Sequence, residues 1–130
     1  MGPIKGITAM RVLIVDDDLS TAELTAECLM LHEDVTVQIV STGEAALRSV
    51  AVNVPDAILL DVELSEGSGL DLAPDLHTLS RGRARIIVFS GNVPNSDFGC
   101  LPPGVDCWLT KPASLADLQA CIRGKPSRLV

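Results

Sequence analysis

The chain has 130 residues, of which 47% are hydrophobic and 21% are charged, a balance typical of one folded domain rather than a disordered chain. Its formal net charge of -7 argues against direct binding to nucleic acid or to an anionic membrane surface. No apolar run approaches the roughly 18 residues that a membrane span needs, and the N-terminus lacks the apolar core of a signal peptide.

Five segments have the composition of β-strands. Most of them are continuous apolar runs, which are typical of strands buried on both faces of a sheet. In chain order, these segments are 10–15, 35–40, 57–60, 85–89 and 106–109.

Apolar residues at helical spacing follow the first two of these strands. Ser20 and Glu23 have the form of a capping box and predict a helix that runs to about Leu31. A second helix is expected over residues 42–50.

Proline positions shape the expected helices of the second half of the chain. A third helix is expected to begin near Asp71, because Pro74 then falls in its first turn, where the missing N–H costs little. The segment 92–104 contains three prolines and has room for one short helical turn at most. The last helix begins at Ser114, which is a capping residue type.

Strands that alternate with helices predict an α/β fold with a parallel sheet covered on both faces. We expect a single domain over residues 10–123. Residues 1–9 are expected to be an N-terminal extension or a vector-derived segment, and residues 124–130 a C-terminal tail.

Polar residues stand at the ends of four of the predicted strands. Asp16 and Asp17 follow the first strand, Asp61 the third, Ser90 the fourth and Lys111 the fifth. Because the carboxyl ends of parallel strands meet at one edge of the sheet, these side chains are expected to converge there.

This combination of side chains indicates phosphoryl-transfer chemistry. Carboxylates that are crowded together repel one another, and a hard divalent cation such as Mg²⁺ relieves the repulsion. A lysine supplies positive charge for an anionic group, and a serine hydroxyl can donate a hydrogen bond to a phosphoryl oxygen. One carboxylate would then be the nucleophile.

Four short motifs together resemble the receiver domain of two-component response regulators. They are Val-Asp-Asp-Asp at 15–18, Leu-Leu-Asp at 59–61, Phe-Ser-Gly at 89–91 and Leu-Thr-Lys-Pro at 109–112, and the resemblance covers about residues 10–123. It implies a flavodoxin-like, doubly wound sheet with strand order 2-1-3-4-5, here with a fourth helix that is short or degenerate.

The resemblance also implies a role for each acidic residue. Asp61 would accept a phosphoryl group from a histidine kinase or a histidine phosphotransfer protein. Asp16, Asp17, Asp61 and the backbone carbonyl of Glu63 would hold Mg²⁺ or Mn²⁺. The domain would be a cytoplasmic phosphoprotein of a phosphorelay, and not an enzyme beyond its own phosphorylation and dephosphorylation.

The resemblance assigns the remaining site residues to charge pairing and switching. Lys111 would pair with the phosphoryl group, Ser90 would donate a hydrogen bond to it, and Trp108 would occupy the position of a switch aromatic coupled to Ser90. The bond between Lys111 and Pro112 is usually cis in receivers.

Two departures from the family pattern affect the expected partners. Ser65 stands where a proline is common, and the proline-rich segment 92–104 stands where the family has its fourth helix. Phosphorylation would switch the surface from the fourth strand to the last helix for an output domain or a downstream protein. The choice between these partners and the formation of a homodimer stay open.

Two alternative functions are compatible with parts of this pattern. Asp16, Asp18 and Ser20 are spaced like the first motif of haloacid-dehalogenase-type phosphatases, with Asp16 as nucleophile and Asp18 as acid and base, but Asp61 would then have no role. A receiver fold could also be an interaction module that works without phosphorylation. The run 16–18 would also suit the beginning of a helix, where carboxylates are favoured.

The four cysteines show no metal-binding spacing. Cys28, Cys100, Cys107 and Cys121 form no C-x-x-C pair, and they are expected to be buried or half-buried reduced thiols.

Overall fold

A parallel sheet forms the centre of the molecule. The computed structural model describes residues 10–31, 34–64, 67–91, 104–111 and 113–123. Five strands lie in the order β2-β1-β3-β6-β7, which confirms the predicted 2-1-3-4-5 topology once a small hairpin is set aside. The strands of the sheet are β1 (Met10–Val15), β2 (Val35–Val40), β3 (Ala57–Leu60), β6 (Arg85–Ser90) and β7 (Cys107–Thr110). The hairpin consists of β4 (Glu63–Leu64) and β5 (Gly67–Ser68).

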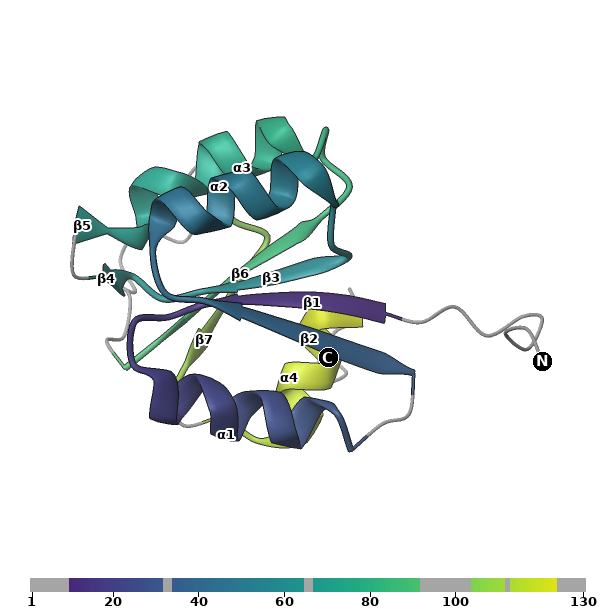
Figure 1. Ribbon diagram of the computed structural model, residues 1–130. Helices are drawn as coiled ribbons and strands as arrows, with labels where there is room; N and C mark the ends of the chain where they lie inside the picture. The colour runs from purple at the N-terminus through teal and green to yellow at the C-terminus, as the bar shows by residue number, and fades with distance from the viewer. Residues whose placement is uncertain (1–9, 32–33, 65–66, 92–103, 112, 124–130) are drawn as a thin grey trace.

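Helices cover both faces of the sheet (Figure 1). One face carries α1 (Leu19–Leu29) and α4 (Leu115–Arg123), and the other carries α2 (Gly43–Val52) and α3 (Ala73–Leu79). None of the helices in the described part of the chain has the length and apolar character that a membrane crossing requires.

Alternate side chains of each central strand enter two separate cores. Val12 and Ile14 of β1 pack in the core beneath α1 and α4, whereas Leu13 and Val15 pack in the core beneath α2 and α3. Each of these four residues is at most 2% exposed. The central strand β3 is therefore apolar and buried at all four positions, since both faces of the sheet are covered there.

The first helix begins at a different cap from the one predicted. Asp18, and not Ser20, is the N-cap of α1: its Oδ1 accepts from the Thr21 N–H at 3.3 Å and its Oδ2 accepts from the Thr21 hydroxyl at 2.9 Å. The predicted capping box at Ser20 and Glu23 is wrong, because Asp18 has extended backbone angles one residue before the first helical residue. The helix also ends at Leu29, before the predicted Leu31.

The other helix starts agree with the sequence. Thr42 caps α2 by accepting from the Ala45 N–H at 3.1 Å, and the Ser114 hydroxyl accepts from the Asp117 N–H at 3.1 Å at the start of α4. Pro74 lies in the first turn of α3, as predicted, after a short 3₁₀ turn over Gly69–Leu72.

Several predictions concern residues outside the described part of the chain. These are the extension 1–9, the tail 124–130, the degenerate helix within 92–103, the loop residue Ser65 and the peptide bond before Pro112.

Three cysteines differ from the expectation of buried or half-buried reduced thiols, and the fourth, Cys100, lies outside the described part of the chain. The structure pairs Cys107 of β7 with Cys121 of α4 as a disulfide, with 6.4 Å between their Cα atoms. This pair could not be predicted from the sequence, because 14 residues separate the two cysteines and only the packing of α4 on β7 brings them together. Cys28 is free and exposed on α1.

The two leucines of α3 allow a matched test of the core. Leu76 is fully buried, whereas Leu79, on the same helix, is 39% exposed. Leu76→Ala is expected to lower the free energy of unfolding by about 2–5 kcal/mol, because shortening this buried side chain leaves a cavity in the core. Leu79→Ala is expected to cost less than about 1 kcal/mol. Urea unfolding followed by circular dichroism measures both, and equal losses would contradict the assignment of the core.

Candidate functional site

Strand pairing places the carboxylates side by side. Val15 of β1 pairs with Leu60 of β3, so Asp16 and Asp61 are the first residues beyond the ends of adjacent parallel strands. The Asp61 N–H donates to the Val15 carbonyl at 3.0 Å, which fixes this register up to the site itself.

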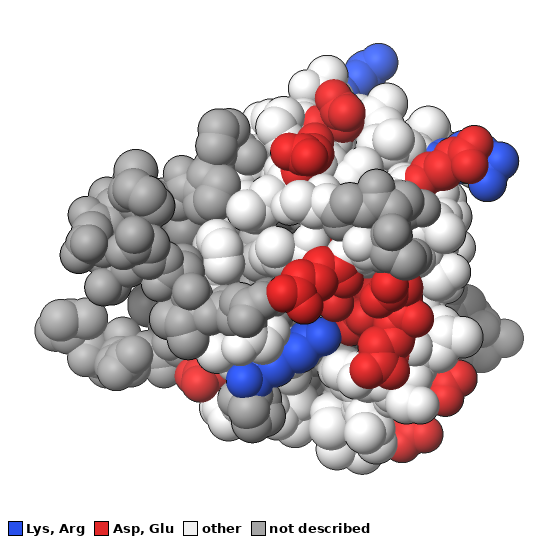
Figure 2. All heavy atoms as spheres, turned by 90° about the vertical axis from the view of Figure 1, so that its left-hand side faces the viewer, with Lys and Arg blue, Asp and Glu red and all other residues white. Residues whose placement is uncertain are grey.

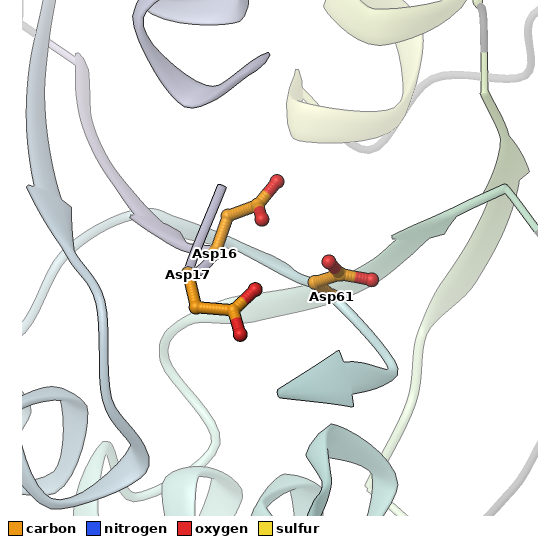
Figure 3. A group of neighbouring side chains, drawn as sticks. All are labelled: Asp16, Asp17 and Asp61. Carbon is orange, nitrogen blue, oxygen red and sulfur yellow. The ribbon is translucent and has the colours of Figure 1, made fainter. Parts of the chain in front are cut away.

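Asp16, Asp17 and Asp61 come together as predicted (Figure 3). Each offers one carboxylate oxygen, and these oxygens all lie within 4.8 Å of one another. Asp16 is 3% exposed and the Asp61 side chain is 12% exposed, while Asp17 lies at the exposed rim. The cluster is therefore partly removed from water. Like charges repel one another more strongly in such a partly buried place than they do in water.

Lys111 faces this cluster. It directly follows β7, which is separated from β3 in the sheet by β6. Its Nζ lies 2.9 Å from Asp16 Oδ2 and 3.8 Å from Asp61 Oδ2. Figure 2 shows acidic side chains gathered on the face where the strands end, with basic side-chain atoms against them. The ammonium thus neutralises part of the negative charge in the site.

Backbone N–H groups hold the two buried carboxylates in a similar way. Asp16 Oδ1 accepts from the Asp18 N–H at 2.9 Å, and Asp61 Oδ1 accepts from the Glu63 N–H at 3.2 Å. Each carboxylate therefore keeps its Oδ2 directed toward Lys111, so the orientation of both groups is fixed before any ligand arrives.

The environment of Asp61 makes its charged form costly. Burial raises the pKa of Asp61 from 3.8 to about 6, although the Glu63 N–H and the Lys111 ammonium oppose the shift. The neighbouring Asp16 carboxylate raises the pKa further. A cation at the cluster would relieve both the desolvation and the repulsion.

Gly69 is a site residue that the sequence interpretation missed. A Cβ atom at this position would overlap the backbone carbonyl oxygen of Asp61. The Gly69 N–H also donates to the Val62 carbonyl, which draws the chain after the hairpin back onto the Asp61 loop. The sequence offered one indication of this role, the glycine itself, because glycine often occurs where two backbone segments approach closely.

The two predicted switch residues, Ser90 and Trp108, belong to the neighbouring strands β6 and β7. Ser90 ends β6 opposite Thr110 of β7, and its side chain is outside the described part of the structure. Trp108 is half-buried against the core beneath α2 and α3. Its Nε1 is buried and donates no hydrogen bond to any residue within the described ranges. Their roles in switching stay predictions.

The donor set fits a hard divalent cation. All three candidate side chains offer carboxylate oxygens, which Mg²⁺ and Mn²⁺ prefer, and the set contains no thiolate or imidazole. Asp18 does not belong to the set, because its carboxylate is bound to Thr21, and this hydrogen bond lowers the pKa of Asp18. The place of the Glu63 carbonyl among the ligands stays a prediction.

Comparison with known proteins gives one consistent family. Residues 12–123 match the family model of the response regulator receiver domain. The response regulator MprA of Mycobacterium leprae is 31% identical over 88% of this chain and 50% of its own length. The chain therefore spans about half the length of the curated relatives it matches.

Solved structures support the same relationship. A CheY-like receiver domain protein from Methanospirillum hungatei has a TM-score of 0.79 and 27% identity over 90% of this chain and 93% of its own. A response regulator from Burkholderia pseudomallei, solved with a phosphorylated aspartic acid, a calcium ion and citrate, has a TM-score of 0.77 and 25% identity over 87% of this chain and 66% of its own.

The raised pKa of Asp61 predicts a specific pH dependence. Because the folded-state pKa is about 6 and the ordinary value is 3.8, the stability contributed by protonated Asp61 is lost as the pH rises from about 4 through about 6. In EDTA, Asp61→Asn is therefore expected to raise the melting temperature at pH 7.5, with a gain that shrinks as the pH falls below about 6.

Calorimetry between pH 4.5 and 7.5 measures this gain, and the side-chain carboxyl carbon signal of Asp61 in NMR titration should move near pH 6. The exposed Asp75→Asn serves as the control for removing a negative charge, because Asp75 lies in the first turn of α3 and does not belong to the cluster. A gain that does not change with pH would contradict the shifted pKa.

Proposed function

Because the chain belongs to the response regulator receiver domain family, we propose that it is a phosphoacceptor of two-component signalling in which Asp61 receives a phosphoryl group from a phosphohistidine. The observation that carries the proposal is the meeting of three carboxylates with Lys111 at one edge of the sheet. Receivers in general perform this reaction at such a site, and the present side chains supply the nucleophile and the charge that it needs.

The reaction would use Asp61 as the nucleophile. An oxygen of the Asp61 carboxylate attacks the phosphorus atom, the bond from phosphorus to the histidine nitrogen breaks, and an acyl phosphate forms. Lys111, which lies 3.8 Å from Asp61 Oδ2, pairs with the phosphoryl oxygens. Ser90 donates a hydrogen bond to the same group.

Asp16, Asp17, Asp61 and the Glu63 backbone carbonyl would hold Mg²⁺ or Mn²⁺. When bound, this cation supplies positive charge that offsets the charges of the carboxylates and of the phosphoryl oxygens. The raised pKa of Asp61 supports the assignment, because the burial of the carboxylate and the nearby Asp16 make its charged form costly, and a bound cation would lower that cost.

The phosphoryl group would then change the surface that a partner contacts. It adds negative charge at the end of β3 and draws Lys111 and Ser90 toward Asp61, so β6, β7 and α4 are the elements we expect to move. Trp108 lies on β7 between these two residues in sequence. The phosphoryl donor would be a cytoplasmic histidine kinase or histidine phosphotransfer protein. The partner that responds to the change would be an output domain or a separate downstream protein.

The haloacid-dehalogenase hypothesis has less support. It needs Asp18 as an acid and base near the nucleophile, but both Asp18 oxygens accept hydrogen bonds from Thr21 at the beginning of α1. A lowered pKa also makes Asp18 a poor proton donor at neutral pH.

Phosphorylation by a small donor tests the proposal directly. Incubation with acetyl phosphate and Mg²⁺ is expected to add one phosphoryl group to the wild-type chain, stable to acid and labile to base, and none to Asp61→Asn. Intact-mass spectrometry measures the adduct, and Asp75→Asn is expected to react like the wild type. An adduct that persists in Asp61→Asn would contradict the assignment, as would no adduct in a wild-type protein that also fails to bind Mg²⁺.

Metal affinity provides a separate test that does not depend on phosphorylation. Asp17→Asn is expected to weaken Mg²⁺ binding at least about tenfold, because the substitution removes a charged ligand. Isothermal titration calorimetry measures the dissociation constant, with Asp71→Asn on the exposed 3₁₀ turn as the matched control. Equal affinities of the two variants would place the cation elsewhere.

A further inference from the structure

An aromatic ring lies beside the lysine of the site. The Nζ of Lys111 is 5.3 Å from the centroid of the Phe89 ring, a distance at which an ammonium is attracted by the negative face of an aromatic ring. Strand pairing explains the contact: Phe89 pairs with Leu109 across β6 and β7, and Lys111 follows Leu109 by two residues. Side chains alternate along a strand, so Lys111 is directed to the same face as Leu109.

We propose that Phe89 is a positioning residue whose ring holds the Lys111 ammonium beside Asp61 for phosphoryl transfer. This inference rests on the proposed function, and it adds a residue that neither touches the phosphoryl group nor carries a charge. The proposal concerns the charge-attracting property of the ring, and not only its bulk.

The ring is well placed for this role because it cannot easily move. Phe89 is 7% exposed and belongs to the core between the sheet and the helices α1 and α4. The Lys111 side chain, by contrast, is 20% exposed and has a flexible four-carbon stem. A fixed ring therefore restricts the positions that the Lys111 ammonium can take. This restriction lowers the entropy cost of placing Lys111 for phosphoryl transfer.

The ring also offers Lys111 a contact that is kept when the ammonium moves from Asp16 to a phosphoryl group on Asp61. Before the reaction the ammonium is closest to Asp16 Oδ2, at 2.9 Å, and it lies farther from Asp61 Oδ2, at 3.8 Å. Pairing with a phosphoryl group on Asp61 requires Lys111 to loosen its contact with Asp16. The Phe89 ring stays attractive throughout, because its interaction with the cation depends on no particular carboxylate.

A graded series of fluorinated rings separates the electrostatic role from packing. Phenylalanines with an increasing number of ring fluorines are introduced at position 89 alone by suppression of an amber codon. Fluorine withdraws electron density from the ring face and changes its size little. At saturating phosphoramidate and Mg²⁺, the rate constant of Asp61 phosphorylation is expected to fall with each fluorine, by about three- to tenfold over the series.

The donor concentration at half-maximal rate is expected to stay constant over the series, because Phe89 does not contact the donor. Phe89→Leu, which keeps an apolar side chain without a ring, is expected to match the most fluorinated protein in rate. A rate that is independent of fluorination, with a loss only in Phe89→Leu, would overturn the proposal and leave Phe89 a packing residue.

NMR of Lys111 tests the contact without any phosphorylation. The chain has three lysines, Lys5, Lys111 and Lys125, so selective ¹³C-lysine labelling gives few signals to assign. The ε-methylene protons of Lys111 are expected to be shifted upfield by the ring in the wild type and to lose this shift in Phe89→Leu. Unshifted protons in the wild type would overturn the proposal.

The two measurements distinguish failure of this inference from failure of the proposed function. A wild type that is phosphorylated on Asp61, with a flat rate over the fluorinated series, overturns the role of Phe89 alone. Absence of any adduct on Asp61 overturns the proposed function, and the positioning role of Phe89 is overturned with it even where the Lys111 signals show the contact.

Discussion

The site depends on the partial burial of two carboxylates opposite one ammonium. Asp16 is 3% exposed and the Asp61 side chain 12% exposed, directly after the buried apolar residues Val15 and Leu60. Charges in such a place are costly unless they are paired, and Lys111 is the cation that both carboxylates face in the described part of the chain. The pairing is incomplete, as the pKa of about 6 for Asp61 indicates. A cation bound at the cluster would offset this remaining cost.

The scaffold keeps these charges close by means of backbone geometry. Parallel pairing aligns the ends of β1 and β3, and the N–H groups of Asp18 and Glu63 each hold one oxygen of the neighbouring carboxylate. Gly69 lets the chain return against the carbonyl of Asp61 without a clash. The pairing of Cys107 with Cys121 joins β7, the strand directly before Lys111, to α4.

The sequence predicted the elements that follow from local patterns and missed those that depend on packing. Apolar runs that end in Asp16 or Asp61 identify buried strands and the edge where a ligand binds, because every residue of the pattern is contiguous in the chain. The cap of α1 was misplaced because Asp18 and Ser20 are both good capping residues, and only the backbone angles at Asp18 decide between them. The sequence predicted Phe89 at the end of a buried strand, and the structure confirms its burial. Its contact with Lys111 could not be predicted, because it depends on the register of β6 and β7.

The two oxygens of Asp16 explain why its ion pair with Lys111 can be exchanged. Oδ1 accepts from the Asp18 N–H, so Oδ2 is the oxygen available both to Lys111 and to a cation at the cluster. A ligand that shares Oδ2 weakens its attraction for the ammonium, which lies within reach of Asp61 as well. The position of Lys111 is therefore a balance between two carboxylates 45 residues apart in the sequence, and a phosphoryl group on Asp61 would shift that balance toward itself. A balance of this kind would allow a local change of charge at Asp61 to move Lys111, and with it β7 and the helix attached to β7.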